Sequence, residues 1–513
     1  MSSLKSSLVA SYSSQIFVAL VGVVMMPTYL YYLGAEAYGL VGFFAMLQAW
    51  FQLLDFGLSP TLARECARHR GGASDNLTLR RLVRVLESVF IVIGTTAALC
   101  LAVGAGWIAT NWLKAVTLSP AEITFALQLI ACTVALRWIS GLYRGALGGL
   151  EQFVWLGTFN AAVATARFVL VVPAMHLVGA TTTVFFVYQV LVAGIEVLVL
   201  VQHTYNRLPS VAPGTRIGWH FRELRQNLRF SLTIAFTGAV WVAVTQFDKL
   251  ILSTMLPLAD FAHFTLAVLL ASSVMIISGP LSSVLLPRLS RLHAQSARTE
   301  ALTLYRQATQ GMALAAGTLA LTLTLAAEPI LFAWTGNRAL AKDIAPLLQL
   351  YALGNGILAL SAFPYYLQFA RGDVRMHLVG NVIFLVVLVP AIVLMTLRHG
   401  ALGAGWVWLI ANILYGLFWV PLVHRKFAPG LHLSWLTRDI GIILVPAAAV
   451  GLLLTLWTPW PSGRLQTGVI VIVGSFCVLL AALPFSSLIR LAILVTLSNV
   501  SRTDETDKKA APP

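Results

Sequence analysis

Long hydrophobic runs recur along almost the whole sequence. The chain has 513 residues, of which 58% are apolar and only 10% are charged, and its mean hydropathy is +0.84. A run of about 18–20 apolar residues is long enough to cross a bilayer as a helix, and this much apolar surface exceeds what a soluble core would bury. The sequence therefore predicts an all-α integral membrane protein with about fourteen transmembrane helices. They are expected at roughly 8–33, 38–59, 86–112, 123–147, 155–177, 182–202, 230–254, 261–286, 308–334, 345–369, 376–397, 401–422, 439–457 and 466–489.

The net charge of +15 is concentrated in alternate loops. Because cytoplasmic loops of membrane proteins are enriched in Lys and Arg, this pattern predicts that both termini are cytoplasmic and that the charge reports topology rather than nucleic-acid binding. The largest basic clusters are Arg64, Arg68, Arg70, Arg80, Arg81 and Arg84, then Arg207, Arg216, Arg222, Arg225 and Arg229, then Arg288, Arg291, Arg298 and Arg306. The opposite loops hold only Lys114, Arg338, Lys342, Arg398 and Arg464.

The chain offers little for catalysis. Its four cysteines lie within or at the cytoplasmic ends of predicted helices, where no disulfide framework is indicated, and no Gly-x-x-x-x-Gly-Lys-Ser/Thr loop is present to bind ATP. We therefore expect no catalytic residue, metal or cofactor. Coupling to H⁺ or Na⁺ stays open.

A sequence repeat divides the chain. The segment Leu33–Gly39 (LGAEAYG) returns, loosened, as Leu256–Ala262 (LPLADFA), an offset of 256 − 33 = 223, and similar echoes continue to about residue 425. With six helices in each copy, both copies enter the membrane in the same orientation, which predicts two lobes around a central cavity. The expected organisation is an N-lobe at 1–205, a cytoplasmic linker at 206–229, a C-lobe at 230–425, two extra helices within 426–490 and a cytoplasmic tail at 491–513, disordered at its end.

Polar side chains form stripes within several predicted helices. Gln48, Gln52, Asp55 and Ser59 fall at i, i+4, i+7 and i+11, which is one continuous face of a helix. Charged groups inside a membrane are costly and usually face the protein interior. The stripe therefore predicts a polar surface that ends at a carboxylate.

Basic residues line further helices at the same spacings. Arg137 and Arg144 lie seven residues apart on one helix, Asn160 and Arg167 seven apart on the next, Glu196 follows on a third, and Asp248 and Lys249 are adjacent on a fourth. A guanidinium matches phosphate oxygens in bidentate geometry and stays charged when partly desolvated. We expect Arg137, Arg144, Arg167, Lys249, Gln48, Gln52 and Asn160 to bind a phosphate-bearing substrate in the cavity.

Other interpretations of these charges stay open. Arg144 and Lys249 lie near helix ends, where their side chains can extend to the membrane surface. Asp55 or Glu196 can form a structural ion pair with Arg137 or Arg167. Alternatively Asp55, Glu196 or Asp248 can bind a coupling ion.

Several motifs together resemble the Wzx-type polysaccharide and O-antigen flippases, a polysaccharide transporter branch of the multidrug/oligosaccharidyl-lipid/polysaccharide exporter superfamily. They span most of residues 1–425 in the expected order. The motifs are Leu33–Leu40 (LGAEAYGL), Leu54–Leu58 (LDFGL) leading into Arg64, Arg144–Phe153 (RGALGGLEQF) with Asn160, Gln246–Leu252 (QFDKLIL), Pro287–Ser290 (PRLS) and Gly400–Ala404 (GALGA).

The resemblance implies a flippase in the bacterial inner membrane. Such a protein moves undecaprenyl-diphosphate-linked oligosaccharide, a repeat unit of O-antigen, exopolysaccharide or capsule, from the cytoplasmic to the periplasmic leaflet by alternating access. It would act beside a polysaccharide polymerase and a chain-length regulator. The alternatives are a cation-coupled multidrug exporter, a lipid II flippase, and a membrane polysaccharide polymerase or ligase; the last would need a larger periplasmic loop than this chain offers.

Overall fold

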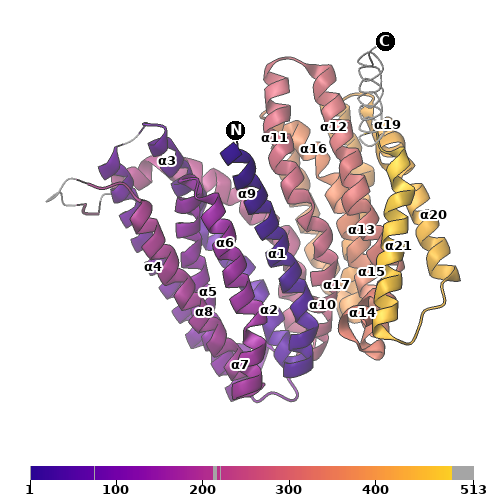
Figure 1. Cartoon of the computed structure of the whole chain (residues 1–513), viewed down its shortest axis with the longest axis horizontal. Coiled ribbons are helices and arrows are strands. Elements are labelled where there is room, and N and C mark those ends of the chain that lie inside the picture. Colours follow the sequence, from indigo (N-terminus) through magenta and orange to yellow (C-terminus); the bar gives the residue numbers. More distant parts are fainter. Residues whose placement is uncertain (1, 74, 212–216, 220, 488–513) are drawn as a thin grey trace, which may run out of the picture. The chain divides into compact units, whose positions relative to one another are not determined.

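The computed structural model describes residues 2–73, 75–211, 217–219 and 221–487. All regular structure in this part of the chain is helical (Figure 1), and the one extended pairing is an isolated bridge between Lys114 and Pro257. The predicted all-α class is therefore confirmed. The predicted tail at 491–513 lies outside the described residues, as does Arg216 of the predicted linker.

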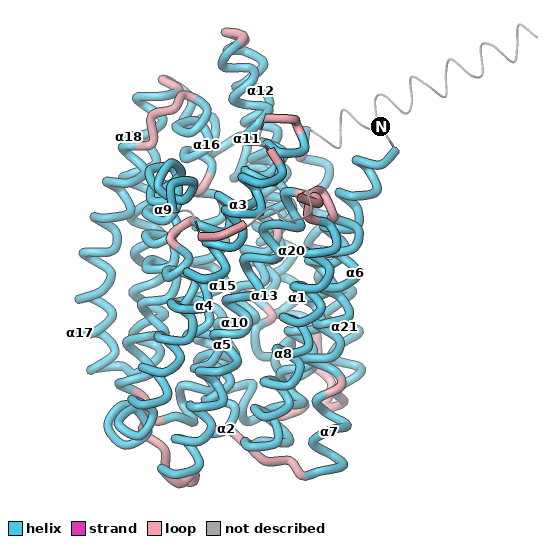
Figure 2. The backbone as a smooth tube through the Cα atoms, turned by 90° about the vertical axis from the view of Figure 1, so that its left-hand side faces the viewer, coloured by secondary structure: helices cyan, strands magenta, loops and turns pink. Residues whose placement is uncertain are grey.

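The chain forms two compact units, residues 1–266 and 267–513. In the first, long helices lie side by side with their connections at the two ends (Figures 1 and 2). Its helices are α1 Ser2–Leu33, α2 Ala35–Phe51, α3 Leu58–Arg70, α4 Asn76–Trp107, α5 Pro120–Gly149, α6 Phe153–Ala164, α7 Val171–Val178, α8 Thr182–Arg207, α9 Phe221–Met255 and the first part of α10 Leu258–Ile276. The lobe boundaries expected from the repeat stay a prediction.

The second unit is also a helical bundle. It contains the end of α10 and α11 Ser278–Ala294, α12 Arg298–Met312, α13 Thr318–Leu325, α14 Ala327–Thr335, α15 Arg338–Ser361, α16 Phe363–Ala370, α17 Arg375–Leu414, α18 Val420–Phe427, α19 Leu431–Ser434, α20 Ile442–Trp457 and α21 Arg464–Ala482. In the described part of the chain, π-helical segments join or extend helices of the two units at Ile108–Trp112, Thr165–Val169, Ala313–Gly317, Tyr415–Trp419 and Trp435–Gly441.

Twelve helical stretches among the described residues are long and apolar enough to cross a membrane, so the count of fourteen is not confirmed. One difference arises at Arg375–Phe427, a single stretch of 53 residues where two helices were expected. Its backbone leaves helical geometry at Gly400 (φ 58°, ψ −143°), between the two predicted segments. The second difference concerns α9. This helix covers the predicted helix 230–254, but it is not one of the twelve candidate membrane-spanning stretches.

The polar stripe predicted from Gln48 to Ser59 is not continuous. Helix α2 ends at Phe51, a 3₁₀ turn follows over Gln52–Asp55, and the backbone then turns through left-handed conformations at Phe56 and Gly57 before α3 begins. One oxygen of Asp55, Oδ1, accepts hydrogen bonds from the backbone N–H (2.9 Å) and hydroxyl (3.0 Å) of Ser59. Asp55 therefore caps the first turn of α3, since a carboxylate satisfies N–H groups that have no partner at a helix start.

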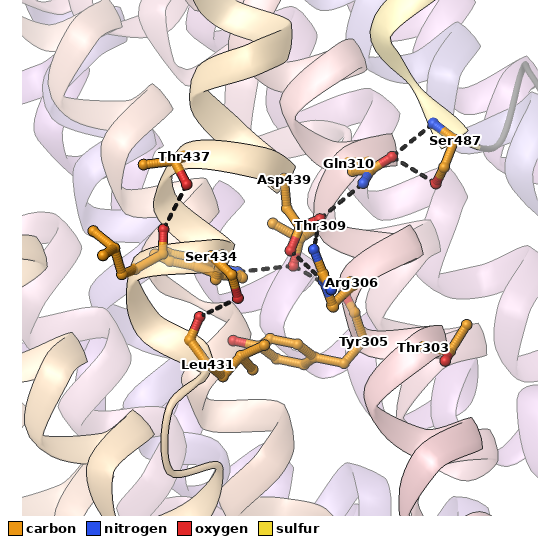
Figure 3. Close-up of polar contacts among 12 residues, drawn as sticks. Thr303, Tyr305, Arg306, Thr309, Gln310, Leu431, Ser434, Thr437, Asp439 and Ser487 are labelled. Carbon is orange, nitrogen blue, oxygen red and sulfur yellow. Dashed lines mark hydrogen bonds and ion pairs between the residues drawn. The ribbon is translucent and has the colours of Figure 1, made fainter.

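A buried carboxylate attaches the last helices of the second unit to α12 (Figure 3). Asp439 is fully buried and accepts hydrogen bonds from Arg306 Nε (2.8 Å) and Nη2 (3.1 Å) and from Gln310 Nε2 (2.8 Å). The amide oxygen of Gln310 in turn accepts from the backbone N–H and the hydroxyl of Ser487, each at 2.7 Å. The π-helical segment that precedes α20 and the chain that follows α21 are thus both bonded to α12.

Candidate functional site

Two polar contacts connect α5 and α8 in the same register. Arg137 Nη2 donates to Gln189 Oε1 at 3.1 Å, and Arg144 Nη2 donates to Glu196 Oε1 at 2.6 Å. In both pairs the partners are 52 positions apart, and the pairs are separated by seven residues on each helix. A spacing of seven returns to the same side of a helix, about 10 Å further along its axis. The two stripes seen in the sequence therefore face each other.

Arg137 is held deep inside the first unit. Only 7% of its surface is exposed, and its Cζ lies 5.3 Å from the centre of the Phe44 ring. Its Nε and Nη1 are buried and make no hydrogen bond to any described residue. Because a buried donor without a partner is costly, this guanidinium is suited to a ligand that supplies acceptors.

Arg167 lies in a π-helical segment, Thr165–Val169, between α6 and α7. The π-helical turn is marked by a hydrogen bond across five residues, from Leu170 N–H to Thr165 O at 3.1 Å. Pro173 follows, and because proline has no N–H it cannot donate to the carbonyl of Val169. Three successive carbonyls accept side-chain hydrogen bonds: Ala166 from Tyr188 Oη (3.0 Å), Arg167 from Gln189 Nε2 (3.1 Å) and Phe168 from Tyr29 Oη (2.7 Å).

Gln189 therefore joins the two deeper arginines. Its amide oxygen accepts from the Arg137 side chain, and its amide nitrogen donates to the Arg167 backbone. Arg167 Nε is itself buried without a hydrogen-bond partner among the described residues. One neutral amide thus bonds to the Arg137 guanidinium and to the Arg167 backbone, while both guanidiniums keep unbonded N–H groups.

The pair of Arg144 with Glu196 lies one heptad away, toward the predicted cytoplasmic side. The Glu196 side chain is 5% exposed and that of Arg144 is 30% exposed. Arg144 Cζ lies 6.0 Å from the Phe159 ring centre, next to Asn160 in sequence. Glu196 Oε2 and Asn160 Oδ1 are buried acceptors with no hydrogen bond in the part of the chain that is described. Buried acceptors without a partner thus lie on Glu196 and Asn160, and buried donors without a partner lie on Arg137 and Arg167.

The site as a whole is cationic. Three guanidiniums, of Arg137, Arg144 and Arg167, stand against one carboxylate, of Glu196, which leaves a net charge of 3 − 1 = +2 on these four side chains. In a medium of low dielectric constant such an excess attracts anions strongly. The arrangement can therefore bind a doubly charged anion such as a diphosphate.

The structure places the other predicted site residues elsewhere. Gln48 is half-buried on α2, and Gln52 is exposed in the turn that follows. Lys249 Nζ bonds within α9, to Thr245 O at 2.8 Å and to Asp248 Oδ1 at 3.4 Å. Asp55 bonds to Ser59 rather than to an arginine. Of the ten predicted residues, the structure brings together Arg137, Arg144, Arg167 and Glu196.

Sequence reasoning did not select Gln189, Tyr29 or Tyr188 as site residues. A signal was present for Gln189, since it precedes Glu196 by seven residues just as Arg137 precedes Arg144. The tyrosines carried no such signal, because their role depends on a π-helical segment that exposes three carbonyls to neighbouring helices.

The fold is shared with solved transporter structures. One is titled "Lipid II flippase MurJ, inward closed conformation" (TM-score 0.70, 12% identity, covering 95% of this chain and 99% of that one). Another is an inward-facing multidrug resistance MATE family transporter of the MOP superfamily (TM-score 0.65, 13% identity, 82% and 100%). A third is a mutant of the Vibrio cholerae MATE transporter VcmN (TM-score 0.57, 14% identity, 83% and 98%). At such identities these likenesses establish the fold alone.

Sequence comparison adds the family. No curated protein matches the chain. The family described as "Polysaccharide biosynthesis protein" matches residues 4–293, which is more than half of the sequence. The predicted resemblance to a polysaccharide transporter branch is thereby confirmed at the level of the family and its fold. With twelve candidate spans among the described residues and this match, the chain is a multi-pass membrane protein that belongs to the polysaccharide biosynthesis protein family.

Proposed function

We propose that the protein is an inner-membrane flippase for an undecaprenyl-diphosphate-linked oligosaccharide. It would carry a repeat unit of O-antigen, exopolysaccharide or capsule from the cytoplasmic to the periplasmic leaflet by alternating access. Both termini would be cytoplasmic, and a polymerase and a chain-length regulator would take up the product. The family match and the shared transporter fold support this class of function.

The observation that carries the proposal is the set of unbonded arginine N–H groups. Arg137 Nε and Nη1 and Arg167 Nε are buried donors without acceptors among the described residues. Charged groups inside a membrane protein are usually retained for function, and a diphosphate supplies several acceptor oxygens with two negative charges. Binding it would satisfy these donors and neutralise the net charge of the site at once.

Arg144 gives the substrate a route to this position. It lies nearer the predicted cytoplasmic end of α5, and its side chain is 30% exposed. An entering phosphate would compete with Glu196 for its guanidinium and would then reach Arg137 and Arg167 one heptad deeper. The released Glu196 carboxylate is the group we assign to H⁺ or Na⁺ coupling.

The membrane potential can contribute to export. Moving one charge through 100 mV is worth about 2.3 kcal/mol, so a diphosphate that crosses with both charges gains on the order of 4–5 kcal/mol when the cytoplasm is negative. Export driven in this way would need no ATP. A cationic drug would gain nothing from this field on the way out and would meet a site of like charge, which is why we favour the lipid-linked anion over a multidrug exporter.

Genetic complementation tests the proposal. In a strain that lacks the gene, Arg137→Ala and Arg167→Ala are each expected to abolish surface polysaccharide while the protein level stays normal. Arg425→Ala is the matched control, because Arg425 is exposed, and it should export normally. Lipid-linked oligosaccharide should accumulate in the inner leaflet in the two inactive strains. Full export by both site variants would exclude the proposed binding site.

Drug sensitivity distinguishes a multidrug exporter from the proposed flippase. If loss of the gene made cells sensitive to cationic dyes and left polysaccharide unchanged, the multidrug exporter would replace the flippase as the better assignment.

A further inference from the structure

Glu36, at the start of α2, binds the loop between α4 and α5. Its Oε1 accepts from Val116 N–H (2.7 Å), and its Oε2 accepts from the N–H of Thr117 (2.9 Å), the hydroxyl of Thr117 (2.7 Å) and the N–H of Leu118 (2.9 Å). Hydrogen bonds to an ionised carboxylate are about twice as strong as neutral ones. One side chain thus fixes three successive residues of the loop.

The same loop is bonded to the turn between α9 and α10. Lys114 O accepts from Leu258 N–H (2.8 Å), Lys114 Nζ donates to Met255 O (3.0 Å), and Trp112 Nε1 donates to Ser253 Oγ (3.0 Å). Lys114 and Pro257 form the isolated bridge. The turn belongs to the second copy of the sequence repeat and the loop to the first, so these bonds join the two copies.

Two glycines allow α2 and α10 to meet closely beside these bonds. A Cβ on Gly39 would lie 2.5 Å from Leu258 O, and a Cβ on Gly42 would lie 2.6 Å from Thr265 Oγ1. Gly42 and Thr265 are equivalent positions in the repeat, since 265 − 42 = 223. Because α2 has no side chain at these two positions, none interlocks with α10 there. The two helices can therefore move apart at Gly39 and Gly42 without a rotamer change on α2.

We propose that residues 112–118, held by Glu36, form a latch that closes the extracytoplasmic end of α2 and α10 and opens once in every transport cycle. Residues 112–118 and 253–258 are assigned to the extracytoplasmic side because the loops rich in Lys and Arg are predicted to be cytoplasmic. The latch bonds are few, and Lys114 is exposed, so water can replace the bond of its ammonium group as that bond breaks. Glu36 makes none of the hydrogen bonds to residues 253–258. It bonds to residues 116–118 and thereby acts as a positioning residue for Lys114 and Trp112. The inference rests on the protein being a transporter but not on the identity of its substrate.

Cysteine accessibility tests the closed latch in the full-length protein in lipid nanodiscs. With the four native cysteines replaced by serine, Ser253→Cys reports on the latch, because Ser253 is 1% exposed. We expect an impermeant maleimide to label it slowly, and Glu36→Gln to raise the rate about tenfold, since an amide keeps one acceptor and turns a donor toward backbone N–H groups. Asp260→Asn, which removes an exposed carboxylate at the start of α10, should leave the rate unchanged.

Ser462→Cys, at an exposed position between α20 and α21, gives the rate for an open site. A Ser253→Cys rate equal to that of Ser462→Cys, or an unchanged rate in Glu36→Gln, would overturn the proposal. This measurement needs no substrate, so it stands even if the proposed flippase activity fails.

A disulfide tests whether the latch must open. Lys114 and Pro257 are bridge partners, and paired backbones lie within disulfide reach. Lys114→Cys with Pro257→Cys should cross-link on oxidation and stop export, and reductant should restore it; each single variant should export in both conditions. Normal export by the cross-linked protein would refute an opening latch. Absence of export in every strain, including the parent, would count against the flippase and leave the labelling result to decide the latch.

Discussion

Arg144 and Glu196 form an ion pair between α5 and α8, with Nη2 and Oε1 2.6 Å apart, one heptad from the contact of Arg137 with Gln189. The sequence placed both residues in membrane helices but did not pair them. Their contact gives Glu196 two roles to distinguish, as a structural partner and as the group that an incoming phosphate displaces. The two roles predict different behaviour in a double variant.

Removing one member of this pair should destabilise the protein. Glu196→Gln leaves the Arg144 guanidinium without its countercharge; since Arg144 is 30% exposed, we expect a loss of about 1–3 kcal/mol rather than the larger cost of a fully buried pair. Arg144→Met with Glu196→Leu should regain thermal stability in detergent, because an apolar pair of similar volume replaces the ions. Polysaccharide export should nevertheless be absent in the double variant, because the proposed substrate contact of Arg144 is gone. Recovery of export would show that the pair is only structural.

Gln189 should matter through charge as well as hydrogen bonding. Gln189→Glu keeps the size of the side chain but places a carboxylate against the Arg137 guanidinium and removes the donor to the Arg167 carbonyl. The added charge would reduce the net positive charge of the site and compete with phosphate. We expect export to fall at least about tenfold, the equivalent of 1.4 kcal/mol, with normal protein level. Tyr188→Phe removes only one hydrogen bond to Ala166 O and should cost less. Equal export by wild type and Gln189→Glu would contradict a phosphate site at this position.

The contact of Gly42 with Thr265 should tolerate no side chain. Gly42→Val is expected to destabilise the protein by about 1–3 kcal/mol through overpacking, because its Cβ would lie 2.6 Å from Thr265 Oγ1. Thr265→Gly in the same chain should relieve the clash at its nearest atoms. Gly104→Val is the matched control, since a Cβ at Gly104 meets nothing within 4 Å. Thermal aggregation of the detergent-solubilised variants, followed by size-exclusion chromatography, measures each effect.

Asp439 should stabilise the attachment of the last helices. Asp439→Asn breaks the charge pair with Arg306, one partner of which is fully buried, and we expect a loss of about 2–3 kcal/mol. Asp373→Asn removes a carboxylate that is paired with Lys426 at 2.8 Å on the surface, and it should change stability little. Limited proteolysis would locate the effect: cleavage near Ser487 should increase for Asp439→Asn alone. Equal cleavage in the two variants would argue against an anchoring role.

The class of the fold followed from hydropathy. The helical membrane class needed only the length and number of apolar runs, because a bilayer admits no unpaired backbone. Helix ends were less predictable. The run at 38–59 predicted one helix, yet α2 ends at Phe51, because Gly57 permits a left-handed turn and Asp55 caps the helix that follows. Hydropathy does not detect either effect.

The sequence by itself determined that this chain lies in a membrane and that arginines occupy the interior of α5 and the segment after α6, while the duplication read from its repeat stays a prediction. Only the tertiary structure decided their partners. Glu196 pairs with Arg144 because α5 and α8 pack in one register, and Asp55 is bonded to the start of α3 instead. Contacts of this kind depend on how helices far apart in sequence are aligned, and spacing along one helix carries no information about that alignment.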